Sequence, residues 1–482
     1  MTAMKTISFK TLAWTLLWFR SAFASTTPSS YVAGIVEYFP YSEVDATDNV
    51  EKNLQAIEPL VESAAKQGAQ IVVFPEYGLT GSLYTSRAPL SKQLEQIPDN
   101  PSGKRILPCN NSSFNSLPSF QKLSCLALSY KIALVVNTGD KQPCTTRDTQ
   151  CPPSGFYQYN TNIAFDSDGC YLAKYHKRHL YGGEKTLYDT PAVEMVSFTT
   201  KFGVTFGTFT CFDILFHSPA MQLVEKGVKN FIFPTFWGSE FPALVSTAVQ
   251  QSWSMLTSTN LIAANIHCQE EYCLTIADLP ATGSGIYMNG TVLSSYMSGD
   301  TFEAGYGVVK TAMVPAQPRS LVANSQGIPK PGYYTDILMK SLEGATYKQL
   351  DYNSSSASVK DPSGNVSCEL HFKFKMKAAE ERYAIGAYYG KRSYGMGAFC
   401  MLVKCSESRG CGEPVQQANS SFEFLQLINS FPGNSTVFPF TLGNQFILLD
   451  PQIITFETNS LTLNHFDEPI LAASLWGCEQ CS

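Results

Sequence analysis

Three short segments of the chain each place a reactive side chain next to a run of apolar residues. The segments are Phe74-Pro75-Glu76, Tyr175-His176-Lys177 and Thr210-Cys211-Phe212-Asp213. A carboxylate, an ammonium and a thiol are the groups needed to cleave an amide through a thioester. In that chemistry Glu76 acts as general base, Cys211 as nucleophile, and Lys177 as the cation that stabilises the oxyanion.

Taken singly, each of these residues has a plainer explanation. Glu76 fits a surface charge at a strand end, and Lys177 lies in a short cationic patch typical of a solvated loop. A cysteine such as Cys211 is more often a buried small residue or half of a disulfide. The hypothesis therefore depends on the combination, because the three residue types complete one mechanism, and on a geometry that the sequence does not show.

The elements that must position these residues alternate between strand and helix from Tyr31 to about Val309. Compact apolar runs predict buried strands at 32–36, 71–74, 202–210 and 231–235, and a helical face follows the first at Val50, Leu54, Ile57, Val61 and Ala64. This is the pattern of an α/β domain whose sheet is covered on both faces. The reactive residues fall at strand ends, where α/β folds build their sites.

Two further features concern the region around Cys211. Ser218-Pro219 predicts a helix cap followed by proline at the first helical position, and Gly227 is a plausible helix stop. The run Phe231–Thr235 resembles 71–76 in having an apolar strand, then Phe-Pro, then a polar residue. This similarity fits two related sheets packed together.

Beyond Ala316 the composition changes. Pro318, Pro329, Pro331 and Gly332 indicate a linker, and β-rich runs follow at 369–375, 398–403 and 446–449. We therefore expect an α/β domain over 25–316, a linker over 317–333 and a smaller β-rich domain over 334–482.

Composition narrows the classes of partner. The chain has 482 residues, of which 44% are hydrophobic, so it can bury a large core. The formal net charge is -6 and no long basic run is present, which argues against nucleic acid as a partner.

The N-terminus and the sequons predict export. Lys5 and Lys10 precede the apolar stretch Leu12–Phe19, and Ala22-Phe23-Ala24 is a typical cleavage site, which gives a signal peptide over 1–24. Asn-x-Ser/Thr triplets begin at Asn110, Asn111, Asn289, Asn353, Asn365, Asn419 and Asn434. The C-terminus carries no long hydrophobic tail, so we expect a secreted glycoprotein without a membrane anchor.

Fourteen cysteines in an exported chain predict disulfides. The local pairs that we expect are Cys109–Cys125, Cys144–Cys151 and Cys405–Cys411, with Cys268–Cys273 and Cys478–Cys481 less secure. Cys170, Cys368 and Cys400 are left as candidates for distant disulfides or for a free thiol.

Longer motifs carry a resemblance to a known family. They include 107–111, 139–141, 151–153, 157–161, 175–177, 183–184, 282–287 and above all the run Cys211-Phe212-Asp213-Ile214-Leu215-Phe216-His217. On these motifs the chain resembles the nitrilase superfamily of carbon–nitrogen hydrolases, in its biotinidase and vanin (pantetheinase) branch.

The resemblance implies a four-layer α-β-β-α sandwich followed by a β-rich domain. It also implies that Glu76, Lys177 and Cys211 form the catalytic triad, that Glu184 assists them, and that no metal or organic cofactor is needed. The expected partner is a small amide substrate, and the expected state is a monomer. A nearby ammonium should lower the pKa of the thiol, so that the thiolate forms near neutral pH.

A hypothesis of a different class comes from related molluscan photoproteins, which this branch also resembles. Such a protein would hold a dehydrocoelenterazine-type chromophore covalently through a cysteine, with Cys368 and Cys400 as candidates. The loop 268–278 is a departure from the family pattern. It looks longer than in pantetheinases and carries two extra cysteines, so the sequence does not decide which amide is the substrate.

Overall fold

The structure is a computed structural model that describes residues 28–100, 103–145, 147–268, 280–319, 339–392, 395–433, 435–464 and 466–478. The predicted signal peptide, most of the predicted linker, most of the loop 268–278 and the sequon at Asn434 lie outside these ranges. Within them, no helix combines the length and the apolar character that a membrane span requires.

Two six-stranded sheets form the first part of the chain. The first sheet has the order β13 (Gly307–Pro315), β1 (Ser30–Tyr38), β2 (Ile71–Val73), β3 (Ala133–Pro143), β4 (Phe156–Phe165) and β5 (Tyr171–His176). The second has the order β12 (Thr291–Tyr296), β11 (Ser284–Met288), β10 (Asn260–Asn265), β8 (Asn230–Thr235), β7 (Thr205–Thr208) and β6 (Ser197–Thr199). The α/β class and the pair of related sheets are as predicted.

Side-chain alternation explains how the sheets stack. Ile71 and Val73 lie in the core between the two sheets, where they join Ile232 of the second sheet. Val72 and Phe74 point to the opposite face and join the core beneath the helices. Because successive residues of a strand point to opposite faces, a continuous apolar run is what a strand covered on both faces requires.

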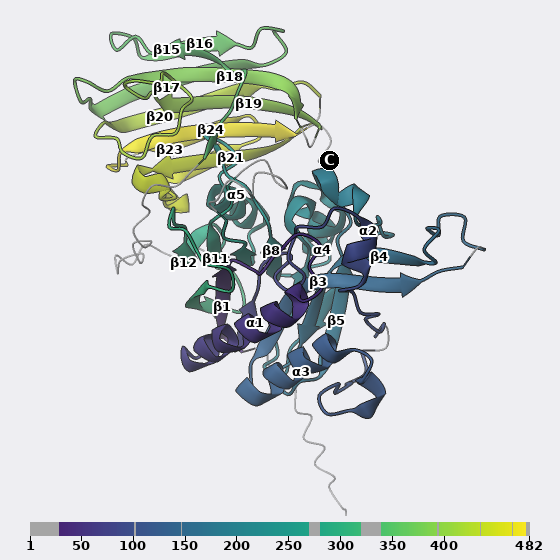
Figure 1. Ribbon diagram of the computed structural model, residues 1–482. Helices are drawn as coiled ribbons and strands as arrows, with labels where there is room; N and C mark the ends of the chain where they lie inside the picture. Colours follow the sequence, from purple (N-terminus) through teal and green to yellow (C-terminus); the bar gives the residue numbers. More distant parts are fainter. Residues whose placement is uncertain are drawn as a thin grey trace, which may run out of the picture.

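Helices cover the two outer faces and complete four layers (Figure 1). On the first sheet lie α1 (Asn49–Lys66) and α3 (Pro118–Tyr130), and beside the second lie α4 (Gln222–Glu225) and α5 (Ser246–Thr257), with α2 (Arg87–Ser91) in a loop. The predicted helical face is confirmed, since Val50, Ile57, Val61 and Ala64 of α1 are all buried.

The region after Cys211 differs from the prediction. The strand before it is only β7 (Thr205–Thr208), and the chain then forms a 3-10 turn and an irregular helix, His217–Met221, before α4 begins. Ser218 lies inside that irregular helix with non-helical backbone angles and makes no side-chain cap. The chain uses these residues to turn sharply at the sheet edge, which is where Cys211 lies.

Two five-stranded sheets form the β-rich C-terminal part. One has the order β15 (Thr346–Gln349), β18 (Tyr383–Arg392), β19 (Gly395–Lys404), β24 (Ile470–Cys478) and β21 (Thr436–Gly443). The other has the order β16 (Ser356–Lys360), β17 (Ser367–Met376), β20 (Ser421–Ser430), β23 (Ser460–Asn464) and β22 (Ile454–Glu457). Leucine, isoleucine and phenylalanine side chains from both sheets share one core.

The predicted strand at 446–449 is wrong. Asn444–Phe446 is a 3-10 turn, and Leu448 makes only an isolated bridge to Leu442. The run is apolar because its side chains are buried in two cores. Phe446 joins the core shared with the first domain, where its ring centroid lies 6.1 Å from that of Phe241, and Leu449 joins the core between the C-terminal sheets. Periodicity cannot distinguish such buried loop residues from a strand.

Disulfides follow the predicted local pattern. Cys109–Cys125, Cys144–Cys151 and Cys405–Cys411 are all formed, and Cys368–Cys400 joins the two C-terminal sheets. Cys268 and Cys478 are also disulfide-bonded, but their predicted partners, Cys273 and Cys481, lie outside the described residues.

The core between the two six-stranded sheets should dominate the stability of the first domain. Ile232 is fully buried there, so Ile232→Ala should lower the free energy of unfolding by about 2–5 kcal/mol through lost burial and the cavity left behind. Denaturant unfolding under oxidising conditions measures this. The matched control is Val44→Ala, because Val44 is 62% exposed and its truncation should cost no more than about 0.5 kcal/mol. Equal losses in the two variants would contradict the assignment.

Candidate active site

The structure brings Glu76, Lys177 and Cys211 together at the ends of strands from both sheets. Glu76 follows β2, Lys177 follows β5, and Cys211 begins the 3-10 turn η3 (Cys211–Leu215) after β7. The Glu76 and Lys177 side chains are each only 1% exposed. Three segments that are distant in sequence therefore converge on one buried site.

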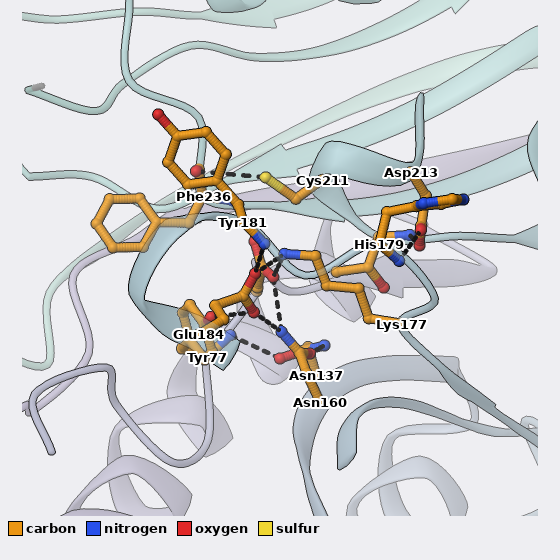
Figure 2. Close-up of polar contacts among 12 residues, drawn as sticks. Tyr77, Asn137, Asn160, Lys177, His179, Tyr181, Glu184, Cys211, Asp213 and Phe236 are labelled. Atoms are coloured by element: carbon orange, nitrogen blue, oxygen red, sulfur yellow. Dashed lines mark hydrogen bonds and ion pairs between the residues drawn. The ribbon is translucent and has the colours of Figure 1, made fainter. Parts of the chain in front are cut away.

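The Lys177 ammonium lies between two carboxylates. Its Nζ atom is 2.7 Å from Oε1 of Glu76 and 2.5 Å from Oε2 of Glu184. Figure 2 shows Lys177 and Glu184 in this contact. The structure thus places Glu184 beside the triad, as the family resemblance implies.

A local turn delivers the Glu184 carboxylate. Glu184 lies in the 3-10 turn η2 (Gly182–Thr186), which begins with Gly182 at a positive φ of 49° that favours glycine. Oε2 of Glu184 accepts a hydrogen bond from the Tyr181 backbone N–H at 2.7 Å, as the third residue of a capping box does. Oε1 accepts from the Tyr77 hydroxyl at 2.5 Å.

Asn160 and Asn137 complete the hydrogen bonding of the two carboxylates, and the sequence assigns neither of them a role. Asn160 Nδ2 donates to Oε1 of Glu76 at 2.7 Å and to Oε1 of Glu184 at 2.9 Å, so it links the two carboxylates. Asn137 Nδ2 in turn donates to Oδ1 of Asn160 at 2.7 Å. Asn160 lies within one of the motifs noted above, but nothing in a sequence marks an asparagine inside a strand as a ligand of distant glutamates.

The backbone of Phe236 links Glu76 to Cys211. Its N–H donates to Oε2 of Glu76 at 2.9 Å, and its carbonyl accepts a contact from the Cys211 thiol at 3.4 Å (Figure 2). Cys211 itself has a φ of 45°, in the left-handed region that costs a non-glycine residue about 1–3 kcal/mol. This sharp turn places Cys211 at the strand end.

Asp213 ties the Cys211 turn to the Lys177 segment. Its fully buried carboxylate accepts from the Thr210 N–H at 3.1 Å, the His179 N–H at 2.8 Å and the Tyr175 hydroxyl at 2.6 Å. Burial raises the pKa of Asp213 to about 7 in spite of these bonds. One side chain thereby connects residues that flank both Cys211 and Lys177.

Burial and charge set the protonation of the triad. Burial raises the pKa of Glu76, although the Lys177 ammonium opposes that shift. Burial alone would lower the pKa of Lys177, but the carboxylates of Glu184 and Glu76 together raise it well above its usual range. Lys177 is therefore a permanent cation, and Glu76 is the titratable group of the pair.

The expectation that the ammonium lowers the pKa of Cys211 enough to give a thiolate near neutral pH is wrong. Burial raises the pKa of the Cys211 thiol, and the negative charge of Glu76 raises it further, while Lys177 lowers it by less. The resting group is a thiol, so attack on a carbonyl requires a base to remove its proton.

Comparisons with known proteins agree with this geometry. Residues 40–294 match the carbon–nitrogen hydrolase family, and residues 337–480 match the vanin C-terminal domain. Pantetheine hydrolase VNN2 of Homo sapiens is 33% identical over 94% of this chain and 88% of its own. The pantetheinase of Mus musculus is 34% identical over 91% and 85%, and the biotinidase of Takifugu rubripes is 33% identical over 88% of each chain.

These findings do not support the photoprotein hypothesis. The relatives named above are hydrolases, and Cys368 and Cys400 are joined to each other in a buried disulfide. Neither sulfur is available as a thiol for a chromophore. Among the described residues the free cysteines are Cys170 and Cys211.

The charge of Glu76 should control the titration of Cys211. Replacing Glu76 with Gln removes a negative charge that raises the pKa of the thiol, so Glu76→Gln should lower that pKa. The ultraviolet absorbance of the thiolate, followed against pH, measures the shift. Subtracting the same titration of Cys211→Ser isolates the signal of Cys211. An unchanged or raised pKa in Glu76→Gln would show that the two groups do not interact as described.

Proposed function

Because the chain belongs to the carbon–nitrogen hydrolase family and is a cysteine-dependent amide hydrolase, we propose that Cys211, Glu76 and Lys177 cleave a linear amide such as that of pantetheine or of a biotinyl amide. The observation that carries the proposal is the convergence of a buried thiol and a buried ion pair on the backbone of one residue, Phe236, whose carbonyl contacts Cys211 and whose N–H binds Glu76. Glu184 acts as an auxiliary carboxylate.

The first half of the reaction forms a thioester. Glu76 takes the proton from the Cys211 thiol as the sulfur attacks the amide carbonyl, which gives a tetrahedral oxyanion. Lys177 stabilises that oxyanion, together with a backbone N–H near Cys211. Glu76 then returns its proton to the leaving amine, and the carbon–nitrogen bond breaks.

The second half releases the acid. Glu76, again a carboxylate, removes a proton from water, and the hydroxide attacks the thioester carbonyl. Collapse of this second tetrahedral intermediate expels the Cys211 thiolate, which recovers its proton from Glu76. The raised pKa of Glu76 suits both proton transfers, because it makes the carboxylate a stronger base than an ordinary glutamate when it accepts a proton.

Lys177 takes no part in these proton transfers. Its pKa is held high by two carboxylates, so it stays charged throughout the cycle. Glu184 and Asn160 hold it and Glu76 in place, which makes the positive charge available without reorganisation when the oxyanion forms.

Export is the second part of the proposal, and its support comes from the sequence and from the position of the sequons. Asn110, Asn353, Asn365 and Asn419 are exposed, whereas Asn111 and Asn289 are partly buried. Together with the N-terminal signal pattern and the disulfides, these sites favour a secreted glycoprotein.

Replacing the nucleophile should abolish turnover. Cys211→Ala removes the only atom that forms the thioester, so amine release from pantetheine and from a biotinyl amide should fall to the uncatalysed rate. Assaying both substrates side by side with the unmodified protein also chooses between the two acyl groups. The control is Cys170→Ser, which removes the other free thiol among the described residues and should leave turnover unchanged. Retained hydrolysis in Cys211→Ala would remove the mechanism.

The pH profile should report the base. Glu76 must be ionised to accept the thiol proton, so kcat/KM should fall as pH decreases through its pKa. Because burial raises that pKa, the midpoint should lie above the ordinary glutamate value of about 4.3. Asp213 also titrates at about pH 7, and Asp213→Asn should keep the acid limb if Glu76 is its source. A midpoint at or below the ordinary value would contradict the assignment.

A further inference from the structure

The segment that carries Phe236 serves two domains. At one end the backbone N–H of Phe236 binds Glu76 and its carbonyl contacts Cys211. Only a few residues further on, the short strand β9 (Glu240–Phe241) pairs in parallel with β14 (Lys340–Ser341), which precedes the C-terminal sheets. The wall of the catalytic site and an attachment point of the second domain are therefore parts of the same stretch of chain.

The second domain holds this stretch by several contacts. The Leu342 N–H donates to the Phe241 carbonyl at 3.0 Å, and the Phe241 ring packs against Phe446. Leu342, Phe241 and Phe446 belong to the hydrophobic core that spans both domains. In Figure 1 the C-terminal sheets lie over α5, the helix that follows this stretch in sequence.

An ion pair also joins the second domain to this stretch. Arg392, at the end of β18, donates from its guanidinium to Oε1 of Glu240. The Glu240 side chain is 7% exposed and that of Arg392 is 20% exposed. Burial raises the pKa of Glu240, and Arg392 is the largest influence that lowers it, ahead of Lys340. A carboxylate this deeply buried is strongly destabilised when its cation is removed.

Hydrogen bonds connect Glu240 back to the site. The Glu240 carbonyl accepts from the Leu244 N–H at 2.9 Å, and the Leu244 carbonyl accepts from the Trp237 indole N–H at 3.0 Å. Trp237 is the residue next to Phe236. A shift of Glu240 toward solvent would therefore displace the backbone of Phe236, whose N–H binds Glu76 and whose carbonyl contacts Cys211.

We propose that Arg392 of the C-terminal domain is a positioning residue for catalysis, acting through Glu240 to hold the backbone of Phe236 against Glu76 and Cys211. The inference rests on the proposed function, since that function makes Glu76 and Cys211 the reacting groups. On this view the second domain contributes to catalysis indirectly, because the Arg392–Glu240 pair positions the reacting groups and does not itself react.

The test compares Arg392→Met with the double variant Glu240→Gln/Arg392→Met in the full-length protein. Arg392→Met leaves Glu240 buried and unpaired, so kcat should fall about 10- to 100-fold, as expected for misplaced reacting groups, with a smaller change in KM. The double variant removes both charges and should recover kcat to within about 3-fold of the unmodified protein, because the strain on the segment is relieved. The pKa of Cys211, read from thiolate absorbance, should shift in the single variant and return in the double.

Lys404→Met is the matched control. Lys404 pairs with the buried carboxylate of Glu381 within the C-terminal part, with side chains 14% and 5% exposed. Its loss should lower thermal stability while kcat and the Cys211 titration stay unchanged. An unchanged kcat and titration in Arg392→Met, or no recovery in the double variant, would overturn the proposal. Should the unmodified protein hydrolyse no amide, the proposed function fails, yet the Cys211 titration still decides whether Arg392 positions the site.

Discussion

The structure depends on one buried cation. Lys177 has been taken out of water with two carboxylates, and such a cluster is tolerated only where every charged atom is paired and every remaining lone pair is hydrogen-bonded. Asn160, the Tyr77 hydroxyl and the backbone N–H groups of Tyr181 and Phe236 supply those bonds. These donors come from separate strands and turns, so the charge cluster can exist only when the α/β domain is fully assembled.

This constraint also explains the state of the nucleophile. The same burial that keeps Lys177 between two carboxylates disfavours a second anion beside Glu76, and the pKa of the Cys211 thiol is consequently raised. In the proposed reaction, ionisation of the thiol and its attack are therefore coupled, because the proton passes to Glu76 as the carbon–sulfur bond forms. A thiol is also oxidised less readily than a thiolate.

The second domain is joined to the first through a shared hydrophobic core. Core residues from α5, β9 and the C-terminal sheets are contiguous, and Gln251 of α5 donates to the Leu449 carbonyl at 2.9 Å. Such an interface limits relative motion of the domains. It also places the loop after β8, which carries Phe236, under the influence of both domains.

Sequence alone determined the fold class, the reactive residue types and the local disulfides, because each is written in nearby residues: apolar runs for buried strands, strand-end placement for Glu76 and Lys177, and short cysteine spacings. The sequence does not predict the hydrogen bonds made by Asn160, by the backbone of Phe236 or by Asp213. Each of these groups binds residues that are distant in the chain, and none has a distinctive local pattern. The direction of the Cys211 pKa was misjudged for the same reason, as burial is a property of the assembled protein and here outweighs the nearby ammonium. The sequence also predicts a strand at 446–449 that the structure does not contain. Residues buried outside a sheet form the same kind of apolar run as residues buried in a strand. The chain's own residues thus determined which chemistry is available, and tertiary packing decided the protonation, the partners and the position of the groups that perform it.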